Sequence, residues 1–144
     1  MDKYDALKLE NQLCFPLYAA SREVIKQYRP FLEALDLTYT QYITMMVLWE
    51  NRQISVKELG KKLFLDSGTL TPVLKSLEAK GLVNRYRSVR DERVLIVEYT
   101  AEGLALRDKA ADIPERIAQC INLDKDEAYT LYSLLYKLLD SGEK

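Results

Sequence analysis

Two cysteines are the residues of this sequence best suited to redox chemistry. The 144-residue chain contains Cys14 and Cys120 and has no histidine. Without histidine it cannot form His-based zinc sites, Ser-His-Asp triads or Cys-His dyads. Two cysteines are also too few for a disulfide scaffold. Each is therefore either an inert small apolar side chain or a reactive thiol, and we expect no metal and no cofactor.

The setting of Cys14 depends on where the first helix begins. Pro16 follows two residues later, and proline is accepted in the first turn of a helix but poorly tolerated in its interior. If the helix begins near residue 15, Cys14 lies at its positive end, which favours a thiolate. If a kinked helix already runs from Leu7, the thiol gains nothing from the helix dipole. The residues leave both alternatives open.

The positive charge of the chain is concentrated in its middle third. The net charge is −1. Residues 55–99 contain 9 Lys/Arg and 6 Asp/Glu and carry +3, whereas residues 1–54 carry −1 and residues 100–144 carry −3. A basic segment of this kind suits contact with nucleic acid, although a solvated face would have the same composition.

Length and hydropathy restrict the class of protein. With 144 residues, 48% of them apolar, the chain is expected to form a single domain, 1–144, with a buried core. No apolar run approaches the roughly 18–20 residues needed to cross a bilayer. The first eight residues lack the apolar stretch of a signal peptide. We therefore expect a cytoplasmic protein that makes no contact with membranes.

Capping signals and apolar spacing predict a mainly helical chain. Thr38, Ser55 and Asp124 are each followed three residues later by Gln or Glu, which is typical of helix N-termini. Thr100 can cap a further helix, and Gly81 can end one. Leucines recur at helical spacing at positions 70, 74 and 77 and again at 131, 134, 135 and 138. The expected elements are a long first helix, helices 39–51, 56–63 and 66–80, a hairpin over 82–99, and helices 101–120 and 125–140.

This order of helices and hairpin is the winged helix-turn-helix pattern, and it predicts two groups of DNA-contacting residues. Helix 66–80 presents small hydroxyls and one cation opposite its leucine stripe, and such side chains fit a major groove. The hairpin tip carries arginines that could reach phosphates or a minor groove. The residues are Ser67, Thr69, Thr71, Lys75 and Ser76 on the helix, and Arg87, Arg90 and Arg93 on the hairpin. Pro72 conflicts with a regular helix here because it removes a hydrogen bond.

Five motifs in chain order resemble the MarR family of bacterial repressors, and the first two narrow the resemblance to its organic-hydroperoxide-resistance regulators. They are Asn11-Gln12-Leu13-Cys14-Phe15, Leu37-Thr38-Tyr39, the run from Leu65 to Pro72, Asp91-Glu92-Arg93, and the run from Thr100 to Gly103. The resemblance covers essentially the whole chain. Pro16 is a departure, because these relatives generally carry another residue there, and it bears on the reactivity of Cys14.

The resemblance implies a mainly α fold with a small β-hairpin. A winged helix-turn-helix over about 39–99 would be flanked by dimerisation helices over about 7–35 and 101–141. It also implies a homodimer that binds a palindromic double-stranded DNA operator, with Asp91 orienting Arg93 in the wing.

For the thiol, the resemblance implies a sensor of organic hydroperoxides. Cys14 would be oxidised, and Tyr28 and Tyr39, from opposite subunits, would hydrogen-bond its thiolate. A sulfenic acid would form first. It would then be resolved by Cys120 of the other subunit or by a small cellular thiol, and the operator would be released.

Three other functions are compatible with parts of the sequence. A MarR-type repressor could be released by a phenolic or drug-like ligand, with Cys14 incidental. A thiol peroxidase lacks support, because no catalytic arginine or threonine motif lies near the cysteine, so we expect no enzyme. A helical interaction module without DNA binding would leave the basic hairpin unexplained.

Overall fold

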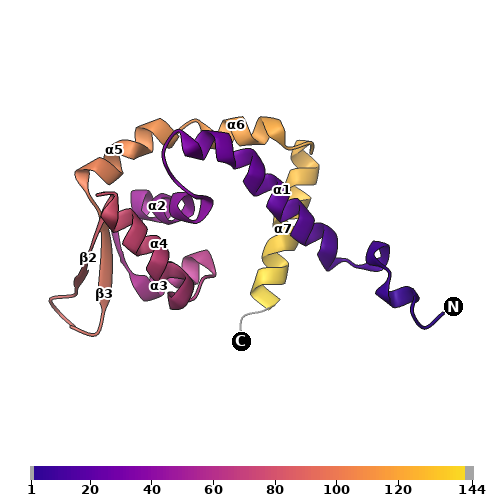
Figure 1. Ribbon diagram of the computed structural model, residues 1–144, viewed down its shortest axis with the longest axis horizontal. Helices are drawn as coiled ribbons and strands as arrows, with labels where there is room; N and C mark the ends of the chain where they lie inside the picture. The colour runs from indigo at the N-terminus through magenta and orange to yellow at the C-terminus, as the bar shows by residue number, and fades with distance from the viewer. Residues whose placement is uncertain (1, 142–144) are drawn as a thin grey trace. The chain divides into compact units, whose positions relative to one another are not determined.

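The computed structural model describes residues 2–141, which form two compact units, 2–113 and 114–141. Figure 1 labels the main elements. The first unit holds two 3-10 turns, η1 (Asp5–Leu7) and η2 (Leu9–Asn11), then α1 (Cys14–Glu33), α2 (Tyr39–Asn51), β1 (Gln53–Ser55), α3 (Val56–Leu63), α4 (Ser67–Ala79), β2 (Val83–Arg87), β3 (Leu95–Tyr99) and α5 (Ala101–Ala110). Helix α6 (Ile113–Cys120) begins at the boundary, and α7 (Lys125–Ser141) follows in the second unit.

Local capping begins the helices where the sequence predicts. The Thr38 hydroxyl accepts a hydrogen bond from the Gln41 N–H at 3.3 Å, and the Gln41 side chain accepts one from the Thr38 N–H at 3.0 Å, so the capping box is confirmed. At α3 and α5 the cap is one-sided: the Ser55 hydroxyl accepts from the Glu58 N–H and the Thr100 hydroxyl from the Gly103 N–H. Helix α4 ends before Gly81, whose φ of 78° is readily adopted only by glycine.

The predicted winged helix-turn-helix fold is confirmed, and its sheet contains one strand more than predicted. We call residues 39–99 the winged-helix lobe. Strands β2 and β3 pair antiparallel as the hairpin, from Val83 opposite Tyr99 to Arg87 opposite Leu95. The short β1 pairs with the other edge of β3, so the sheet has the order β1-β3-β2. Figure 1 shows the hairpin extending from the helices of the lobe.

The core of the lobe is built from leucines that face one another. The largest fully buried apolar side chains come from α2, α3, α4, β2 and β3 and are Met45, Leu48, Leu59, Leu70, Leu74, Leu77, Val83 and Val97. Helix α5 packs against α2 at Gly103, where a Cβ atom would overlap the Leu82 carbonyl oxygen. Glycine is therefore required there for the close approach. The Trp49 indole N–H donates to the Gly103 carbonyl at 2.8 Å across the same contact.

Two predicted helices have different bounds. The expected helix 101–120 is two helices, α5 and α6, separated by a turn at residues 111–112. Pro114 explains the break, because it lacks an N–H and its ring would clash with the Ala110 carbonyl in a continuous helix. The first helix begins at Cys14 rather than near residue 7 and ends at Glu33. Within residues 2–141, no helix is both long enough and apolar enough to span a bilayer.

Candidate functional site

Cys14 is the first residue of α1, and its thiol is free and exposed. Leu13, the N-cap residue, makes no side-chain hydrogen bond to the helix. Pro16 is then the third helical residue, where the absence of an N–H costs nothing. Of the two alternatives that the sequence left open, the structure therefore has the helix that begins near residue 15, and the kinked helix from Leu7 is wrong. Cys14 lies at a helix end whose backbone N–H groups favour negative charge.

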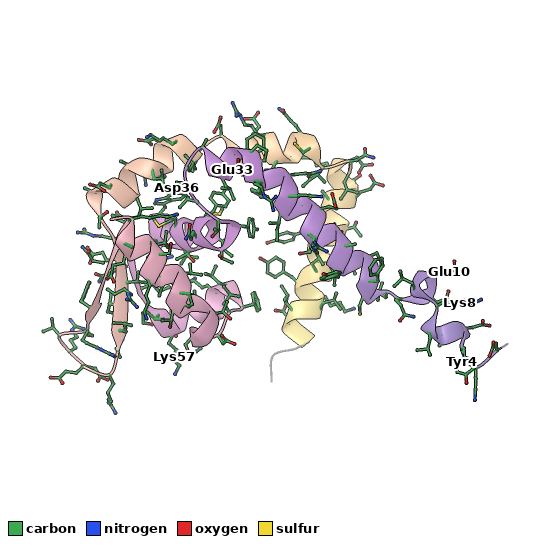
Figure 2. All side chains as sticks on the ribbon, in the orientation of Figure 1. Tyr4, Lys8, Glu10, Glu33, Asp36 and Lys57 are labelled. Carbon is green, nitrogen blue, oxygen red and sulfur yellow. The ribbon has the colours of Figure 1, made fainter. Side chains whose placement is uncertain are left out.

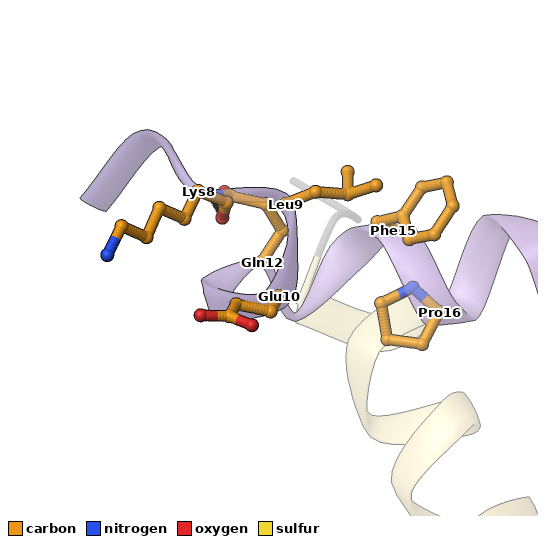
Figure 3. Close-up of a pocket in the computed structure, with 6 residues that line it drawn as sticks. All are labelled: Lys8, Leu9, Glu10, Gln12, Phe15 and Pro16. Atoms are coloured by element: carbon orange, nitrogen blue, oxygen red, sulfur yellow. Dashed lines mark hydrogen bonds between the residues drawn. The ribbon is translucent and has the colours of Figure 1, made fainter. Parts of the chain in front are cut away.

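A hollow lies beside this helix end (Figure 3). It has a volume of about 670 Å³ and is open to solvent. Its lining combines apolar Leu9, Phe15 and Pro16 with polar Lys8, Glu10 and Gln12.

Tyr28 and Tyr39 lie together, and a third tyrosine joins them. The ring centroids of Tyr28 and Tyr39 are 5.0 Å apart in an edge-to-face arrangement. Tyr42 lies 5.8 Å from Tyr28 and 6.3 Å from Tyr39. Sequence reasoning missed Tyr42, although its spacing of three from Tyr39 places both rings on one face of α2. We call these three residues the tyrosine cluster.

The phenol of Tyr28 is held in its neutral form. Burial, and then the neighbouring Tyr39 and Tyr42, raise the pKa of Tyr28 from 10.0 to about 12. Burial also raises the pKa of Tyr42. A neutral phenol is a hydrogen-bond donor, so the cluster can donate to an anion but cannot act as a base near neutral pH.

A single chain does not bring Cys14 and the tyrosine cluster together. Cys14 and Tyr28 lie on the same continuous helix, separated by about 21 Å at about 1.5 Å of rise per residue. Tyr39 is in contact with Tyr28 and is therefore also remote from the thiol. A site that combines the thiol with these phenols needs a second copy of the chain.

Cys120 lies in the other unit, as the last residue of α6. Its thiol is exposed and donates to the Arg116 carbonyl at 3.4 Å. Both cysteines are therefore free and accessible in the single chain.

The predicted DNA-contacting face of α4 is exposed except at two positions. Ser67, Thr69 and Lys75 are exposed. Thr71 is half-buried, and its hydroxyl donates to the Ser67 carbonyl at 2.8 Å. Ser76 was wrongly placed on this face, because it is half-buried and accepts a hydrogen bond from the Gln41 side chain. The helix runs through Pro72 and loses only the bond that its N–H would make to the Gly68 carbonyl.

The wing tip holds one arginine in a defined position. Arg93 makes a two-pronged contact with the Asp91 carboxylate, with Nε at 3.1 Å and NH2 at 3.2 Å. The Arg93 backbone N–H adds a third bond at 3.0 Å, and these bonds lower the pKa of Asp91. The Arg93 side chain is nevertheless 90% exposed, so its remaining N–H groups point to solvent. Arg87 and Arg90 are also exposed.

Sequence reasoning missed the bond that fixes the wing to α4. Glu78, near the end of α4, accepts from Arg85 NH2 at 3.1 Å and from the Arg85 backbone N–H at 3.2 Å. These bonds lower the pKa of Glu78. Helix and hairpin are thus tied at the base of the wing. No local sequence signal identifies this pair, because the two residues meet only when β2 folds back along α4.

Across the described residues, 2–141, no group of three or more Cys, Asp and Glu side chains could hold a metal.

Comparisons with known proteins agree with this architecture. Residues 26–110 match the family described as transcriptional regulator SarA/Rot. The chain is 48% identical over 140 residues to the organic hydroperoxide resistance transcriptional regulator of Bacillus subtilis, covering 97% of this chain and 95% of that protein.

Solved structures are similar over nearly the whole chain. Reduced AbfR bound to DNA has a TM-score of 0.80 and 33% identity and covers 99% of this chain and 100% of that one. The disulfide-formed state of AbfR, a protein of Staphylococcus epidermidis, has a TM-score of 0.67 and covers 96% and 95%. A cysteine-to-serine mutant of Escherichia coli MarR, complexed with operator DNA, has a TM-score of 0.78 and 26% identity and covers 96% and 99%. With a winged-helix lobe and relatives of this identity and coverage, the chain belongs to the MarR/SarA family of transcriptional regulators, which are not enzymes.

Proposed function

We propose that this protein is a homodimeric repressor that releases a palindromic operator when an organic hydroperoxide oxidises Cys14. The observation that carries the proposal is the position of Cys14, free and exposed at the N-terminal end of α1. Support comes from the relative named for organic hydroperoxide resistance and from the relative solved in both a DNA-bound and a disulfide-formed state.

DNA contact is assigned to α4 and the wing. The exposed Ser67, Thr69 and Lys75 would face the major groove, with Thr71 at its edge. Arg87, Arg90 and Arg93 would reach phosphates or a minor groove. Because Asp91 holds Arg93 while leaving it exposed, the guanidinium needs little further ordering on binding.

Dimerisation is assigned to the terminal helices. Apolar side chains are exposed in the single chain both before and within α1 and along α7, and such surfaces on a folded chain mark an interface. They are Leu7, Leu9, Leu13, Phe15 and Leu17 at the N-terminal end, and Leu131, Leu134, Leu138 and Leu139 on α7. A two-fold dimer would also supply the partner phenols that the thiol lacks within its own chain.

The chemistry at Cys14 is a two-electron oxidation. The thiolate sulfur attacks one peroxide oxygen, an S–O bond forms, and the O–O bond breaks. The transferred oxygen keeps its hydrogen, so the sulfur becomes a sulfenic acid, and the other oxygen leaves as an alkoxide that takes a proton from solvent to give an alcohol. The neutral phenols of Tyr28 and Tyr39 from the partner would donate hydrogen bonds to the thiolate before the attack.

The sulfenic acid then condenses with a second thiol and releases water. The second thiol is that of Cys120 from the other subunit or that of a small cellular thiol. A disulfide needs Cα atoms about 4.4–6.8 Å apart, so closure onto Cys120 would move α6 if the reduced thiols lie farther apart. Such a displacement would switch the protein between two conformations, and oxidation would shift the equilibrium between them.

The test compares Cys14→Ser with Cys120→Ser in a gel shift with duplex DNA flanking the protein's own gene, before and after stoichiometric cumene hydroperoxide. Cys14→Ser should bind like the unmodified protein and stay bound after oxidant. Cys120→Ser should still be oxidised at Cys14 by intact mass. Release of Cys14→Ser by oxidant would refute the thiol sensor and favour release by a phenolic ligand.

A non-reducing gel distinguishes between the two candidates for the resolving thiol. A covalent dimer that disappears in Cys120→Ser identifies Cys120 as the resolving residue. A wholly monomeric band, with added mass only at Cys14, assigns resolution to a small thiol.

A further inference from the structure

The side chain of Gln41 is a buried polar group that joins two helices of the winged-helix lobe. It is only 6% exposed. Its oxygen accepts from the Thr38 N–H at 3.0 Å and from Lys80 Nζ at 3.0 Å. Its amide nitrogen donates to the Ser76 hydroxyl at 2.9 Å. The oxygen and the nitrogen of the carboxamide are therefore both hydrogen-bonded.

These bonds connect the start of α2 to the end of α4. Thr38 is the N-cap of α2, whereas Ser76 lies in the last turn of α4 and Lys80 is its C-cap residue. Lys80 also donates to the backbone carbonyl of Asp36, which Figure 2 labels in the connection between α1 and α2. The Asp36 carboxylate lies 3.7 Å from the same ammonium. The end of the DNA-contacting helix is thus tied to the segment that enters α2.

The same turn of α2 carries two members of the tyrosine cluster. Tyr39 and Tyr42 flank Gln41 in the sequence, and their rings contact Tyr28 of α1. A displacement of the rings that moves the first turn of α2 would also move the backbone that bears Gln41. Because packed interiors transmit displacements rather than absorb them, the carboxamide would pass such a movement to α4.

We infer that Gln41 is a positioning residue that couples the tyrosine cluster to the DNA-contacting helix, through Ser76 and Lys80. The inference rests on the proposed function, since it assigns the route by which oxidation of Cys14 alters α4. In the reduced state the carboxamide holds the end of α4 against the first turn of α2. When oxidation removes the thiolate that the phenols hydrogen-bond, the turn shifts and α4 follows.

The test measures the ratio of the DNA dissociation constant after oxidation to that before, with cumene hydroperoxide and the DNA flanking the protein's own gene. Gln41→Met keeps the length of the side chain but removes all three hydrogen bonds. Coupling energies between sites usually correspond to about 5- to 150-fold in affinity, so Gln41→Met should lower the ratio at least about fivefold. Ser76→Ala, which removes one bond, should lower it less.

Two variants serve as controls. Gln41→Glu keeps an acceptor for the Thr38 N–H, for Lys80 and for the Ser76 hydroxyl, so it should preserve the ratio. Ser55→Ala removes one capping bond at the start of α3, away from the tyrosine cluster, and should lower stability without changing the ratio. Intact mass should show equal oxidation of Cys14 in all variants.

The outcomes separate this inference from the proposed function. If the unmodified protein is oxidised at Cys14 but keeps its DNA affinity, both are wrong. If the unmodified protein responds while Gln41→Met and Ser76→Ala show the same ratio as it does, only the coupling role of Gln41 is wrong. A merely structural role predicts lower thermal stability with an unchanged ratio. If Gln41→Met does not fold, Ser76→Ala decides.

Discussion

Helices α4 and α7 carry similar leucine stripes but bury them differently. Leu70, Leu74 and Leu77 on α4 are at most 1% exposed, because α2, α3 and β2 pack over them. On α7, Leu134 is 54% exposed in the single chain. The same periodicity therefore indicates an amphipathic helix in both places but says nothing about its partner. For α4 the partner is the rest of the lobe, and for α7 we propose a second copy of the chain.

The largest expected effect is in the lobe. Leu77→Ala should lower the free energy of unfolding by about 2–5 kcal/mol, because it leaves a cavity in a fully packed core. Denaturant unfolding followed by circular dichroism measures the change. A loss below about 1 kcal/mol would mean that the site collapses around the smaller side chain.

A charge on α7 tests whether its exposed leucines form the interface with a second copy of the chain. Leu134→Glu should weaken self-association at least about tenfold, because a carboxylate would be buried without a partner at the proposed interface. Analytical ultracentrifugation across a concentration series measures the dimer dissociation constant. An unchanged constant would place the dimer interface elsewhere. Leu134→Met, which conserves volume and polarity, is the matched control.

The next prediction concerns the wing and DNA affinity. Arg93→Ala should weaken binding of duplex DNA flanking the protein's own gene about 5- to 150-fold, as expected for the loss of a minor-groove or bidentate contact. The core should be untouched, since the side chain is exposed, so thermal unfolding should match that of the unmodified protein. Equal affinity at moderate salt would remove the wing from the DNA interface.

Lys75→Ala distinguishes a phosphate contact from a base contact. If Lys75 contacts only phosphate, the affinity should fall nearly uniformly across DNA sequences. The slope of log affinity against log salt concentration should fall by about one. A loss confined to one DNA sequence would instead assign Lys75 to a base edge.

The smallest change expected is spectroscopic and concerns the tyrosine cluster. The pKa of Tyr28 is raised to about 12, so its neutral phenol stabilises the fold fully below about pH 10. That stabilisation is lost as the pH rises through about 12. An ultraviolet titration of the unmodified protein minus that of Tyr28→Phe should show one phenol ionising near pH 12. Ionisation near pH 10 would mean that the cluster is open to water.

Local signals predicted much of the fold and of the site. Capping residues and the glycine after α4 act within one turn of the chain, so they could be interpreted without knowing the tertiary structure, whereas Pro16 allowed two starts for the first helix. The break at Pro114 was missed because apolar residues keep helical spacing across it, at Ala110, Ile113 and Ile117. Strand β1 was missed because three residues carry no clear alternation, and they form a strand only by pairing with β3.

The sequence by itself determined the starts of the capped helices, the basic hairpin and the absence of histidine chemistry, whereas the structure decided that Cys14 begins α1. Only the tertiary structure decided that Ser76 faces Gln41 instead of solvent, that Glu78 holds Arg85, and that Tyr42 joins the cluster. The physical reason is the separation along the chain over which each kind of interaction acts. Capping and helix propensity depend on neighbours within about four residues, whereas these contacts join positions brought together by packing. The separation of Cys14 from Tyr28 also follows only once α1 is known to be one continuous helix.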